Sequence, residues 1–206
     1  IKGSAEMLAA KLQDAQPLVS ELAGYISSEV NRLNALVTRF LDFARPMSVQ
    51  LQPHQIPDIV EHSIEAVESH LPKSKVHVER RYAADLAPIP VDEQLCERVF
   101  VNLITNAYQA MDGAANGDKA LSISVAPESS GGRDGIGVVI EDTGPGVPPE
   151  LREQIFNPFF TSKKDGVGLG LSIVAKIVDE HRGWIKLEND QGRGARFHIF
   201  LPAAES

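Results

Sequence analysis

The stretch DEQLCERVFVNLITNAYQAM, residues 92–111, combines a strong helical signal with two asparagines in its middle. Its apolar residues recur at helical spacing, and Asp92 stands where an N-cap residue is expected. Asn102 and Asn106 are four positions apart, so a helix presents both on one face. Their amides need polar partners among the surrounding Val, Leu and Ile. The side-chain oxygen of Asn106 suits Mg²⁺ held with nucleotide phosphates, whereas two surface polar residues are the plainer alternative.

A second motif, VVIEDTGPGVP at residues 138–148, predicts a strand that ends in an acid and runs into a turn. A carboxylate at Asp142 can accept a hydrogen bond from an exocyclic amine such as that of adenine. Taken alone, an aspartate before Gly144 and Gly146 is more typical of an Asx turn. This motif therefore favours a nucleotide-binding role only in combination with the other motifs.

A third motif, NPFFTSKK at residues 157–164, places two aromatic residues and two cations in one loop. Phe159 and Phe160 follow a proline, and they indicate either local packing or the anchor of a lid. Lys163 and Lys164 can reach phosphate groups, and a solvated pair of charges is an equally good interpretation.

The fourth motif, KKDGVGLGLSI at residues 163–173, has three glycines before a helical pattern. Glycine is unfavourable inside a helix, so Gly166, Gly168 and Gly170 favour either a flexible linker or a backbone that closely approaches a ligand. Backbone N–H groups at a helix N-terminus bind anions, and the helix dipole adds to the attraction. The order and separation of all four motifs favour a phosphate cradle.

Composition limits the classes of protein that remain. The chain has 206 residues, 43% of them hydrophobic, and a net charge of -8 with no basic stripe, which disfavours nucleic-acid binding. Its single cysteine, Cys96, excludes an internal disulfide and favours a reducing, cytoplasmic setting, with Cys96 itself in the core. We find no apolar run of about 20 residues, so we expect no membrane contact from this chain. Because it begins with Ile1, we interpret it as a piece of a longer protein, whose membrane anchoring stays open.

Residues 1–46 carry a pattern unlike the rest. Pro17 indicates the start of a second helix, and Pro46 its end. Along this helix the apolar residues recur at steps of three and four, which is typical of a helical bundle. We call them the apolar seam: Leu22, Ile26, Val30, Leu33, Val37, Phe40 and Ala44. We predict an antiparallel hairpin that dimerises into a four-helix bundle, with packing on the chain's own C-terminal domain as the alternative.

From about residue 47 onward the pattern predicts an α+β domain, built as a two-layer sandwich of helices on one mostly antiparallel sheet. Residues 127–135, rich in Ser and Gly, are interpreted as a surface loop. The expected strands are residues 48–52, 76–83, 120–127, 136–142, 183–189 and 195–202, and the expected helices are residues 57–71, 92–111 and 171–181.

The four motifs together resemble the N, G1, F and G2 boxes of sensor histidine kinases of the nitrogen-regulatory type. These kinases belong to an ATPase superfamily that also includes gyrase-type topoisomerases, a heat-shock chaperone and the mismatch-repair protein MutL. The resemblance covers almost the whole chain, because EVNRLNALVTRFLDFARP is similar to the second helix of the family's dimerisation and phosphoacceptor hairpin. It implies domains at residues 1–46, a truncated hairpin, and 47–206, a catalytic ATP-binding domain.

The resemblance also implies roles for single residues. Asn106 would bind Mg²⁺, Asn102 would act in the phosphate environment, and Asp142 would bind the adenine amine. We assign catalytic roles to Asn102 and Lys163. The expected contacts with ATP come from the adenine loop, the lid and the phosphate cradle: Asn106, Asp142, Gly144, Gly146, Phe159, Phe160, Lys164, Gly166, Gly168, Gly170 and Leu171.

Two positions bear on the choice within the superfamily. Members that hydrolyse ATP commonly carry Glu at the position of Asn102, and an amide cannot serve as a general base. Asn102 therefore disfavours an ATP hydrolase, while a non-catalytic nucleotide-binding dimerisation module would be favoured by a damaged motif. Near the C-terminus, Ala195 replaces the Thr or Ser that is common in the family, so one hydroxyl is absent.

The family transfers the γ-phosphoryl group of ATP to a histidine in an H-E-x-x-N-P type motif, and this motif is missing here. Of the six histidines, His181 ends a helix and His198 alternates with apolar residues in a strand, so we interpret both as structural. We expect the acceptor to lie upstream of Ile1. The resemblance implies homodimerisation through the hairpin, and a response regulator receiver domain as the partner that receives the phosphoryl group.

Overall fold

The computed structural model describes residues 17–44, 47–71, 76–112, 119–161, 167–188 and 194–203. The chain divides into two compact units, residues 1–46 and residues 47–206. Within the described residues, no helix is both long and apolar enough to cross a membrane.

The first unit contains one long described helix, α2 (Pro17–Ala44). It begins at the proline that predicted its start, since proline is well tolerated in the first turn of a helix. Four residues of the apolar seam are half exposed or more, namely Leu22, Ile26, Leu33 and Val37. The first helix of the predicted hairpin lies outside the described residues, so the hairpin stays a prediction.

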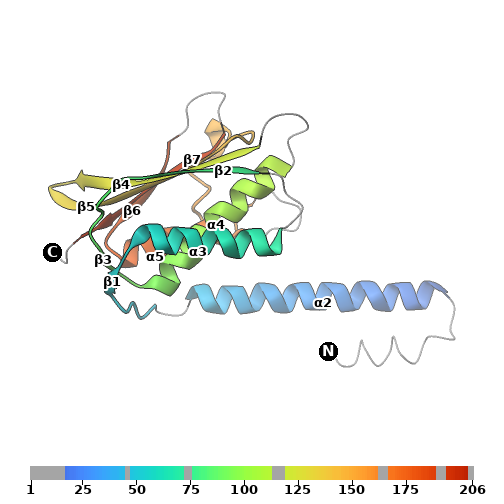
Figure 1. Cartoon of the computed structure of the whole chain (residues 1–206). Coiled ribbons are helices and arrows are strands. Elements are labelled where there is room, and N and C mark those ends of the chain that lie inside the picture. Colours follow the sequence, from blue (N-terminus) through green and yellow to red (C-terminus); the bar gives the residue numbers. More distant parts are fainter. Residues whose placement is uncertain are drawn as a thin grey trace. The chain divides into compact units, whose positions relative to one another are not determined.

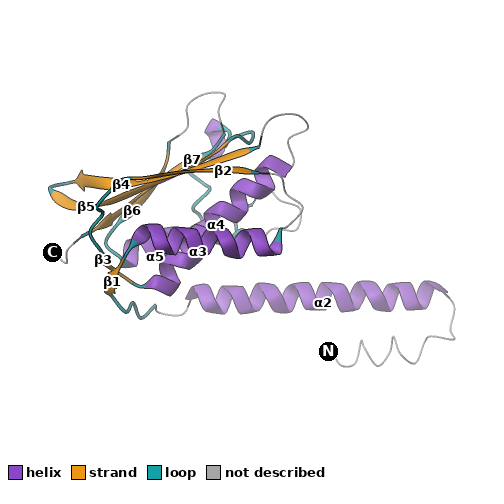
Figure 2. Cartoon of the chain, in the orientation of Figure 1, coloured by secondary structure: helices purple, strands orange, loops and turns teal. Residues whose placement is uncertain are grey.

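The second unit is built on a five-stranded sheet in the order β2-β4-β5-β7-β6 (Figures 1 and 2). Only β2 and β4 are parallel, and the other three neighbouring pairs are antiparallel, as the sequence predicts. A separate pair, β1 with β3, forms a small antiparallel ribbon. The strands are β1 (Gln52–His54), β2 (His77–Tyr82), β3 (Ile89–Val91), β4 (Ala120–Ser130), β5 (Arg133–Asp142), β6 (Trp184–Leu187) and β7 (Arg196–Pro202).

Three helices cover one face of this sheet, which gives the expected two-layer α+β sandwich (Figure 1). They are α3 (Ile56–His70), α4 (Glu93–Asp112) and α5 (Gly170–Glu180), and a 3-10 turn, η1 (Pro149–Leu151), follows β5. The helix α4 packs against α3, α5 and β5, so it is the centre of the helical layer. Its apolar side is buried through Phe100, Leu103, Ile104 and Met111, which are at most 1% exposed.

The start of α4 is fixed by the predicted cap. The carboxylate of Asp92 accepts a hydrogen bond from the backbone N–H of Leu95 at 3.1 Å, which confirms Asp92 as the N-cap. The backbone N–H of Asp92 donates to Nε2 of His181 at 2.9 Å, at the end of α5. His181 is buried, with Nδ1 on the carbonyl of Ile177 at 2.8 Å, so its interpretation as structural is confirmed. Burial raises the pKa of the Cys96 thiol to about 12, in line with its place in the core.

Two elements differ from the sequence-based prediction. The loop expected at residues 127–135 is instead a continuation of β4 and β5, joined by the two residues Gly131 and Gly132 alone. Both glycines have positive φ, 60° and 78°, which is the conformation that a two-residue hairpin turn requires. The strand expected at residues 48–52 is also wrong, because strand structure begins only at Gln52, where β1 pairs with β3.

Candidate functional site

The carboxylate of Asp142 is held at one of its two oxygens. Asp142 is the last residue of β5 and is 5% exposed. Its Oδ1 accepts hydrogen bonds from the backbone N–H of Gly144 at 2.7 Å and from that of Ala195 at 3.2 Å. Among the described residues, nothing donates to Oδ2. An ionised, buried carboxylate with one oxygen saturated and the other unsatisfied is suited to accept a hydrogen bond from a ligand.

The environment of Asp142 also changes its acidity. Burial raises the pKa of Asp142 above its ordinary value, and the N–H groups of Gly144 and Ala195 oppose this shift by stabilising the charged form. The neighbouring charge of Glu141 adds a smaller increase. Such a perturbed acid at the end of a strand is typical of a functional position.

Gly194 is a site residue that sequence reasoning missed. A Cβ built at Gly194 would overlap with the backbone carbonyl of Asp142, so only glycine allows the chain to approach this closely. The approach brings the N–H of Ala195 onto the Asp142 carboxylate, and the carbonyl of Ala195 accepts the N–H of Asp142 at 3.0 Å. The side chain of Ala195 takes no part in these two bonds. The sequence signal was the glycine that precedes Ala195 and Phe197 in GARF.

Asn102 and Gly170 come together from two helices. A Cβ on Gly170, the first residue of α5, would lie 3.0 Å from Oδ1 of Asn102 in α4. The orientation of the amide is set by its other end, because Nδ2 of Asn102 donates to the carbonyl of Arg98 at 2.7 Å. The side-chain oxygen of Asn102 therefore faces the N-terminus of α5, where the glycine motif ends.

The aromatic motif and the glycine motif also meet. A Cβ on Gly168 would overlap with the backbone of Phe159, and both residues have positive φ, 71° and 67°. Phe159 is 55% exposed, whereas Phe160 is half-buried. Just before them, the ring of Phe156 packs edge-on against Phe197 of β7, with 6.4 Å between the ring centroids. This contact joins the segment after η1 to the sheet.

The remaining candidate residues are placed as follows. Asn106 is half-buried on α4, one turn after Asn102, and Leu171 is half-buried in the first turn of α5. Gly146 has a positive φ of 73° in the turn after β5. Three candidates, Lys163, Lys164 and Gly166, lie outside the described residues.

The helix α4 contacts both Gly170, through Asn102, and Gly144, through Ala110. A Cβ on Gly144 would lie 3.2 Å from Cβ of Ala110, eight residues after Asn102 on α4. Eight residues of α-helix span about 12 Å, which is on the scale of an extended nucleoside triphosphate. Within the described ranges, no group of three or more His, Cys, Asp or Glu side chains could hold a metal ion. A cation here would be held by amide oxygens and a ligand, for which Asn106 has the right chemistry.

A comparison with protein-family models matches residues 91–205 to the histidine kinase-, DNA gyrase B- and HSP90-like ATPases. The chain belongs to this family. The match begins at β3 and contains every residue of the site. The resemblance inferred from the four motifs is thus confirmed at the level of the family.

Curated relatives of this ATPase domain are named as sensor histidine kinases. The chain is 34% identical over 182 residues to the sensor histidine kinase ZraS of Salmonella typhimurium, covering 88% of this chain and 38% of that protein. It is 30% identical over 213 residues to the sensory histidine kinase/phosphatase NtrB of Rhizobium meliloti, covering 100% of this chain and 54% of that protein. The chain thus spans between two fifths and about half of the length of these relatives.

Solved structures share the fold. One is full-length ShkA in complex with AMPPNP, with a TM-score of 0.70 and 22% identity, over 98% of this chain and 43% of that one. Another is the histidine kinase ThkA in complex with the response regulator protein TrrA, with a TM-score of 0.71 and 24% identity, over 98% of this chain and 57% of that one.

Proposed function

We propose that this chain is the ATP-binding catalytic region of a two-component sensor histidine kinase. It binds ATP with Mg²⁺ and transfers the γ-phosphoryl group to a histidine that is not among its own six. A response regulator aspartate then receives the group. Membership of the ATPase family and the names of the curated relatives support this proposal.

The observation that carries the proposal is the state of the Asp142 carboxylate. Two backbone N–H groups fix Oδ1, so the direction of Oδ2 is fixed as well. A carboxylate oxygen accepts hydrogen bonds only, and it therefore selects a ligand that presents an N–H donor, as the exocyclic amine of adenine does. Such preorganisation gives both affinity and discrimination.

The middle of α4, where Asn102 faces the first residue of α5, supports the assignment of the phosphate end. The helix α5 begins at Gly170 with no side-chain cap among the described residues, and the backbone N–H groups of a helix N-terminus favour an anion. Asn106 would hold Mg²⁺ through its amide oxygen, with the other ligands coming from the phosphates and water. Magnesium neutralises charge on the phosphates during phosphoryl transfer. Lys163, Lys164 and Gly166, on the predicted lid, would complete the contacts with the phosphates.

The orientation of Asn102 favours phosphotransfer over ATP hydrolysis. Its Nδ2 donates to the carbonyl of Arg98, so its Oδ1 is the atom that faces the N-terminus of α5. An amide oxygen cannot take a proton from water at neutral pH. An enzyme with this residue needs a nucleophile that is reactive without such a base, and a neutral imidazole meets that need.

The partners follow from the same proposal. The half-exposed apolar seam of α2 would be buried by a second copy of the chain, as a helix pair of this kind needs partners to be stable. The neighbour ThkA was solved with a response regulator, and we propose a receiver domain as the partner here too. The free thiol of Cys96 is compatible with a reducing, cytoplasmic location.

Calorimetric titration with ATP and with ADP, each with Mg²⁺, tests the nucleotide site. Native protein should bind both nucleotides. Asp142→Ala should lower the affinity by at least about tenfold, because it removes a charge-assisted hydrogen bond. The matched control is Asp134→Ala, which removes an exposed aspartate at the other end of the same strand. Equal affinities for the native protein and Asp142→Ala would remove Asp142 from the adenine site.

A labelling experiment tests the phosphotransfer. With γ-labelled ATP, this chain alone should remain unlabelled, and a longer version that includes the upstream helix should acquire label that is stable to base and labile to acid. Strong labelling of this chain alone would mean that one of its own six histidines is the acceptor.

A further inference from the structure

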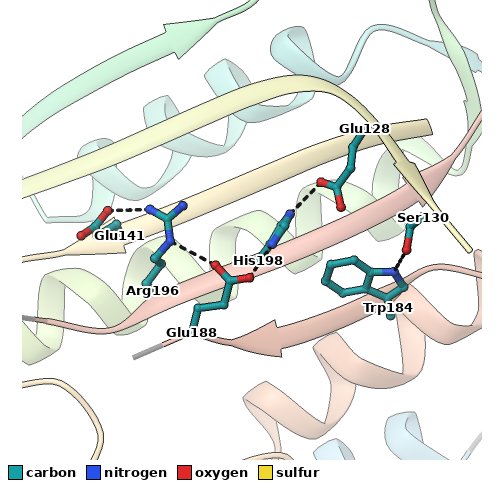
Figure 3. A network of polar contacts seen from close by, with 7 residues as sticks. All are labelled: Glu128, Ser130, Glu141, Trp184, Glu188, Arg196 and His198. Atoms are coloured by element: carbon teal, nitrogen blue, oxygen red, sulfur yellow. Dashed lines mark hydrogen bonds and ion pairs between the residues drawn. The ribbon is translucent and has the colours of Figure 1, made fainter. Parts of the chain in front are cut away.

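A chain of charged groups lies on the face of the sheet opposite the three helices (Figure 3). Arg196, the first residue of β7, donates from Nη1 to Glu141 of β5 at 2.8 Å. Its Nε donates to Glu188, just after β6, at 3.2 Å. One guanidinium thus joins the strand on each side of β7 near the same end of the sheet.

The chain of contacts continues through His198, two residues along β7. Its Nδ1 lies 2.8 Å from Oε1 of Glu188 and its Nε2 lies 2.7 Å from Oε2 of Glu128 on β4. Each ring nitrogen thus lies within hydrogen-bond distance of a carboxylate oxygen, which can only accept. The side chain of Glu128 crosses β5 at Gly137 to reach His198. Glycine leaves room for it, whereas a Cβ on Gly137 would overlap with the Glu128 carboxylate.

The aromatic side chain of Trp184 packs beside His198. The ring of Trp184 on β6 meets the His198 ring edge-on, with 4.9 Å between centroids, and stacks on Phe200 at 5.9 Å. Its Nε1 donates to the hydroxyl of Ser130 at 2.9 Å, and Nζ of Lys186 lies 4.4 Å from its ring centroid. We call Glu128, Glu141, Glu188, Arg196 and His198 the reverse-face network. It ties together β4, β5 and β7 and the end of β6.

This network ends beside the candidate adenine site. Glu141 and Asp142 are consecutive on β5, and Arg196 and Ala195 are consecutive at the start of β7. Glu141 is opposite Arg196 in the register of the two strands. The next residue, Asp142, donates its backbone N–H to the carbonyl of Ala195 and accepts the N–H of Ala195 at Oδ1. Successive residues of a strand point to opposite faces. The ion pair is therefore on the reverse face of the same backbone contact that fixes Oδ1 of Asp142.

We propose that Arg196 is a positioning residue for the nucleotide: through Glu141 and Glu188 it holds the start of β7 in register, so that Ala195 orients the Asp142 carboxylate. This inference rests on the proposed function. Because Arg196 lies on the reverse face, it would act without touching the nucleotide. When it is removed, the backbone of Ala195 loses the side-chain contacts that fix it against β5. The Asp142 carboxylate can then rotate, and Oδ2 no longer has one direction.

The consequence is selective for the base. A carboxylate that can rotate lowers the affinity only for a ligand that donates a hydrogen bond to it. A site built around an N–H donor discriminates against an analogue without that donor. ATP presents an exocyclic amine, and inosine triphosphate presents a carbonyl oxygen at the same position. Loss of Arg196 should weaken ATP binding and leave the binding of inosine triphosphate unchanged. A general loosening of the fold would weaken both.

The experiment measures the dissociation constants of ATP and inosine triphosphate, each with Mg²⁺, by calorimetry. Native protein should prefer ATP, and Arg196→Ala should reduce this preference by about tenfold, the worth of one charge-assisted hydrogen bond. The matched control is Arg80→Ala. Arg80 pairs with Glu61 at 2.9 Å, and the exposed fractions of that pair, 40% and 35%, match the 41% and 35% of Arg196 and Glu141. Arg80 lies on the edge strand β2, so its removal should leave the preference intact.

Two further variants guard against misfolding and add a conservative replacement. Glu141→Gln breaks the same ion pair from the β5 side and should reduce the preference for ATP. Arg196→Lys keeps the charge without the forked geometry and should restore part of the preference. Thermal unfolding without nucleotide checks that each variant is folded at the temperature of the titration. If Arg196→Ala does not fold, the Glu141→Gln result decides.

Each remaining outcome overturns the inference. If folded Arg196→Ala keeps the native preference, or loses affinity for both nucleotides equally, Arg196 is merely structural. If native protein does not prefer ATP at all, the adenine role of Asp142 fails first, and the inference fails with it. The native titration therefore separates the two failures.

Discussion

Glu141 and Asp142 are adjacent acids on one strand, yet the two faces of the sheet treat them differently. Glu141 lies on the reverse face, where Arg196 is its partner at 2.8 Å. Asp142 is buried on the side of the helices, where backbone N–H groups hold Oδ1 and no described group reaches Oδ2. Burial raises the pKa of Asp142, whereas Glu141 has a cation to balance its charge.

The comparison extends to the two faces as a whole. On the reverse face, every carboxylate of the network contacts Arg196 or His198, so these groups have polar partners without a ligand. On the helical side, Oδ2 of Asp142 and Oδ1 of Asn102 receive no hydrogen bond from the residues that the structure describes. Buried polar groups without partners are costly, and proteins retain them where function requires it. Unsatisfied groups therefore mark the candidate binding site more sharply than charge does.

The largest effect should come from replacing Gly194, whose backbone passes against the carbonyl of Asp142. Gly194→Ala places a Cβ into the carbonyl of Asp142, so β7 must move away. We expect a loss of about 1–3 kcal/mol in the free energy of unfolding, as for overpacking, together with loss of ATP binding. Urea unfolding and calorimetry would measure the two effects.

The control for this variant is Gly24→Ala in α2, where a Cβ would meet nothing within 4 Å. Alanine is favoured over glycine in a helix by about 1 kcal/mol, so this variant should be neutral or slightly more stable. If Gly194→Ala were as stable as Gly24→Ala, the close approach at Asp142 would not exist.

The second-largest effect should come from replacing the unsatisfied oxygen of Asp142, and it concerns nucleotide affinity. Asp142→Asn keeps an oxygen for the N–H groups of Gly144 and Ala195 and replaces the unsatisfied oxygen with an N–H₂ donor. ATP affinity should fall by about 10- to 100-fold, and inosine triphosphate, which presents an acceptor, should gain relative to ATP. Parallel titrations with both nucleotides would measure this reversal.

The stability of Asp142→Asn has a predictable sign. The folded-state pKa of Asp142 is raised, so its contribution to stability is full below the unfolded value of about 3.8 and is lost as the pH rises through the folded value. At neutral pH the native protein therefore lacks this contribution, and Asp142→Asn, which is always neutral, should have an equal or higher Tm. A lower Tm at pH 7 with an unchanged Tm at pH 3 would contradict the burial argument.

The third effect is a pH dependence of binding. In the proposed site, Oδ2 of the ionised Asp142 carboxylate accepts from the adenine amine. Because Oδ1 already accepts two N–H groups, protonation would turn Oδ2 into a donor. The pKa of Asp142 is raised, so ATP affinity should begin to fall at a pH above 3.8. Below the raised pKa, the decline should approach about tenfold per pH unit. Titrations of the native protein and Asp142→Asn over the same pH range would measure it, because the variant removes this group and retains every other titration, including that of the nucleotide.

Much of the fold could be predicted from the sequence because its signals are local. The cap at Asp92, the periodicity of residues 92–111 and the alternation in residues 196–202 each determine one element. The Gly131–Gly132 hairpin was mistaken for a long loop because residues 127–135 are rich in Ser and Gly and because polar residues such as Glu128 suggested solvent. On the reverse face of a sheet, polar residues are ordinary strand residues, and only their cross-strand partners reveal this.

The site could be predicted only in part, for a similar reason. The motif order identified Asp142, Asn102 and Gly170 as candidates, and the structure brings Asn102 to Gly170 and Gly144 to Asp142. Gly194 and Arg196 were not found, because the contacts of Gly194 with Asp142 and of Arg196 with Glu141 join residues more than fifty positions apart. No pattern within one stretch of sequence shows that a glycine faces a carbonyl on another strand.

The smallest effect should come from the middle of the reverse-face network. The hydrogen bond from His198 is the main cause that lowers the pKa of Glu188, and Arg196 adds to it. A lowered folded-state pKa means that this acid stabilises the fold above its unfolded value of about 4.5 and that the contribution is lost as the pH falls through the folded value. Glu188 is 42% exposed, so solvent screening limits its contribution to stability.

Glu188→Gln should cost about 0.5 kcal/mol at neutral pH and nothing at a pH where the native acid is protonated. Urea unfolding at a series of pH values would measure this, with Glu65→Gln on the exposed side of α3 as the control that should change nothing. A difference that persists in acid would mean that shape, and not charge, explains the contribution of Glu188, and the reverse face would then be held by packing around Trp184.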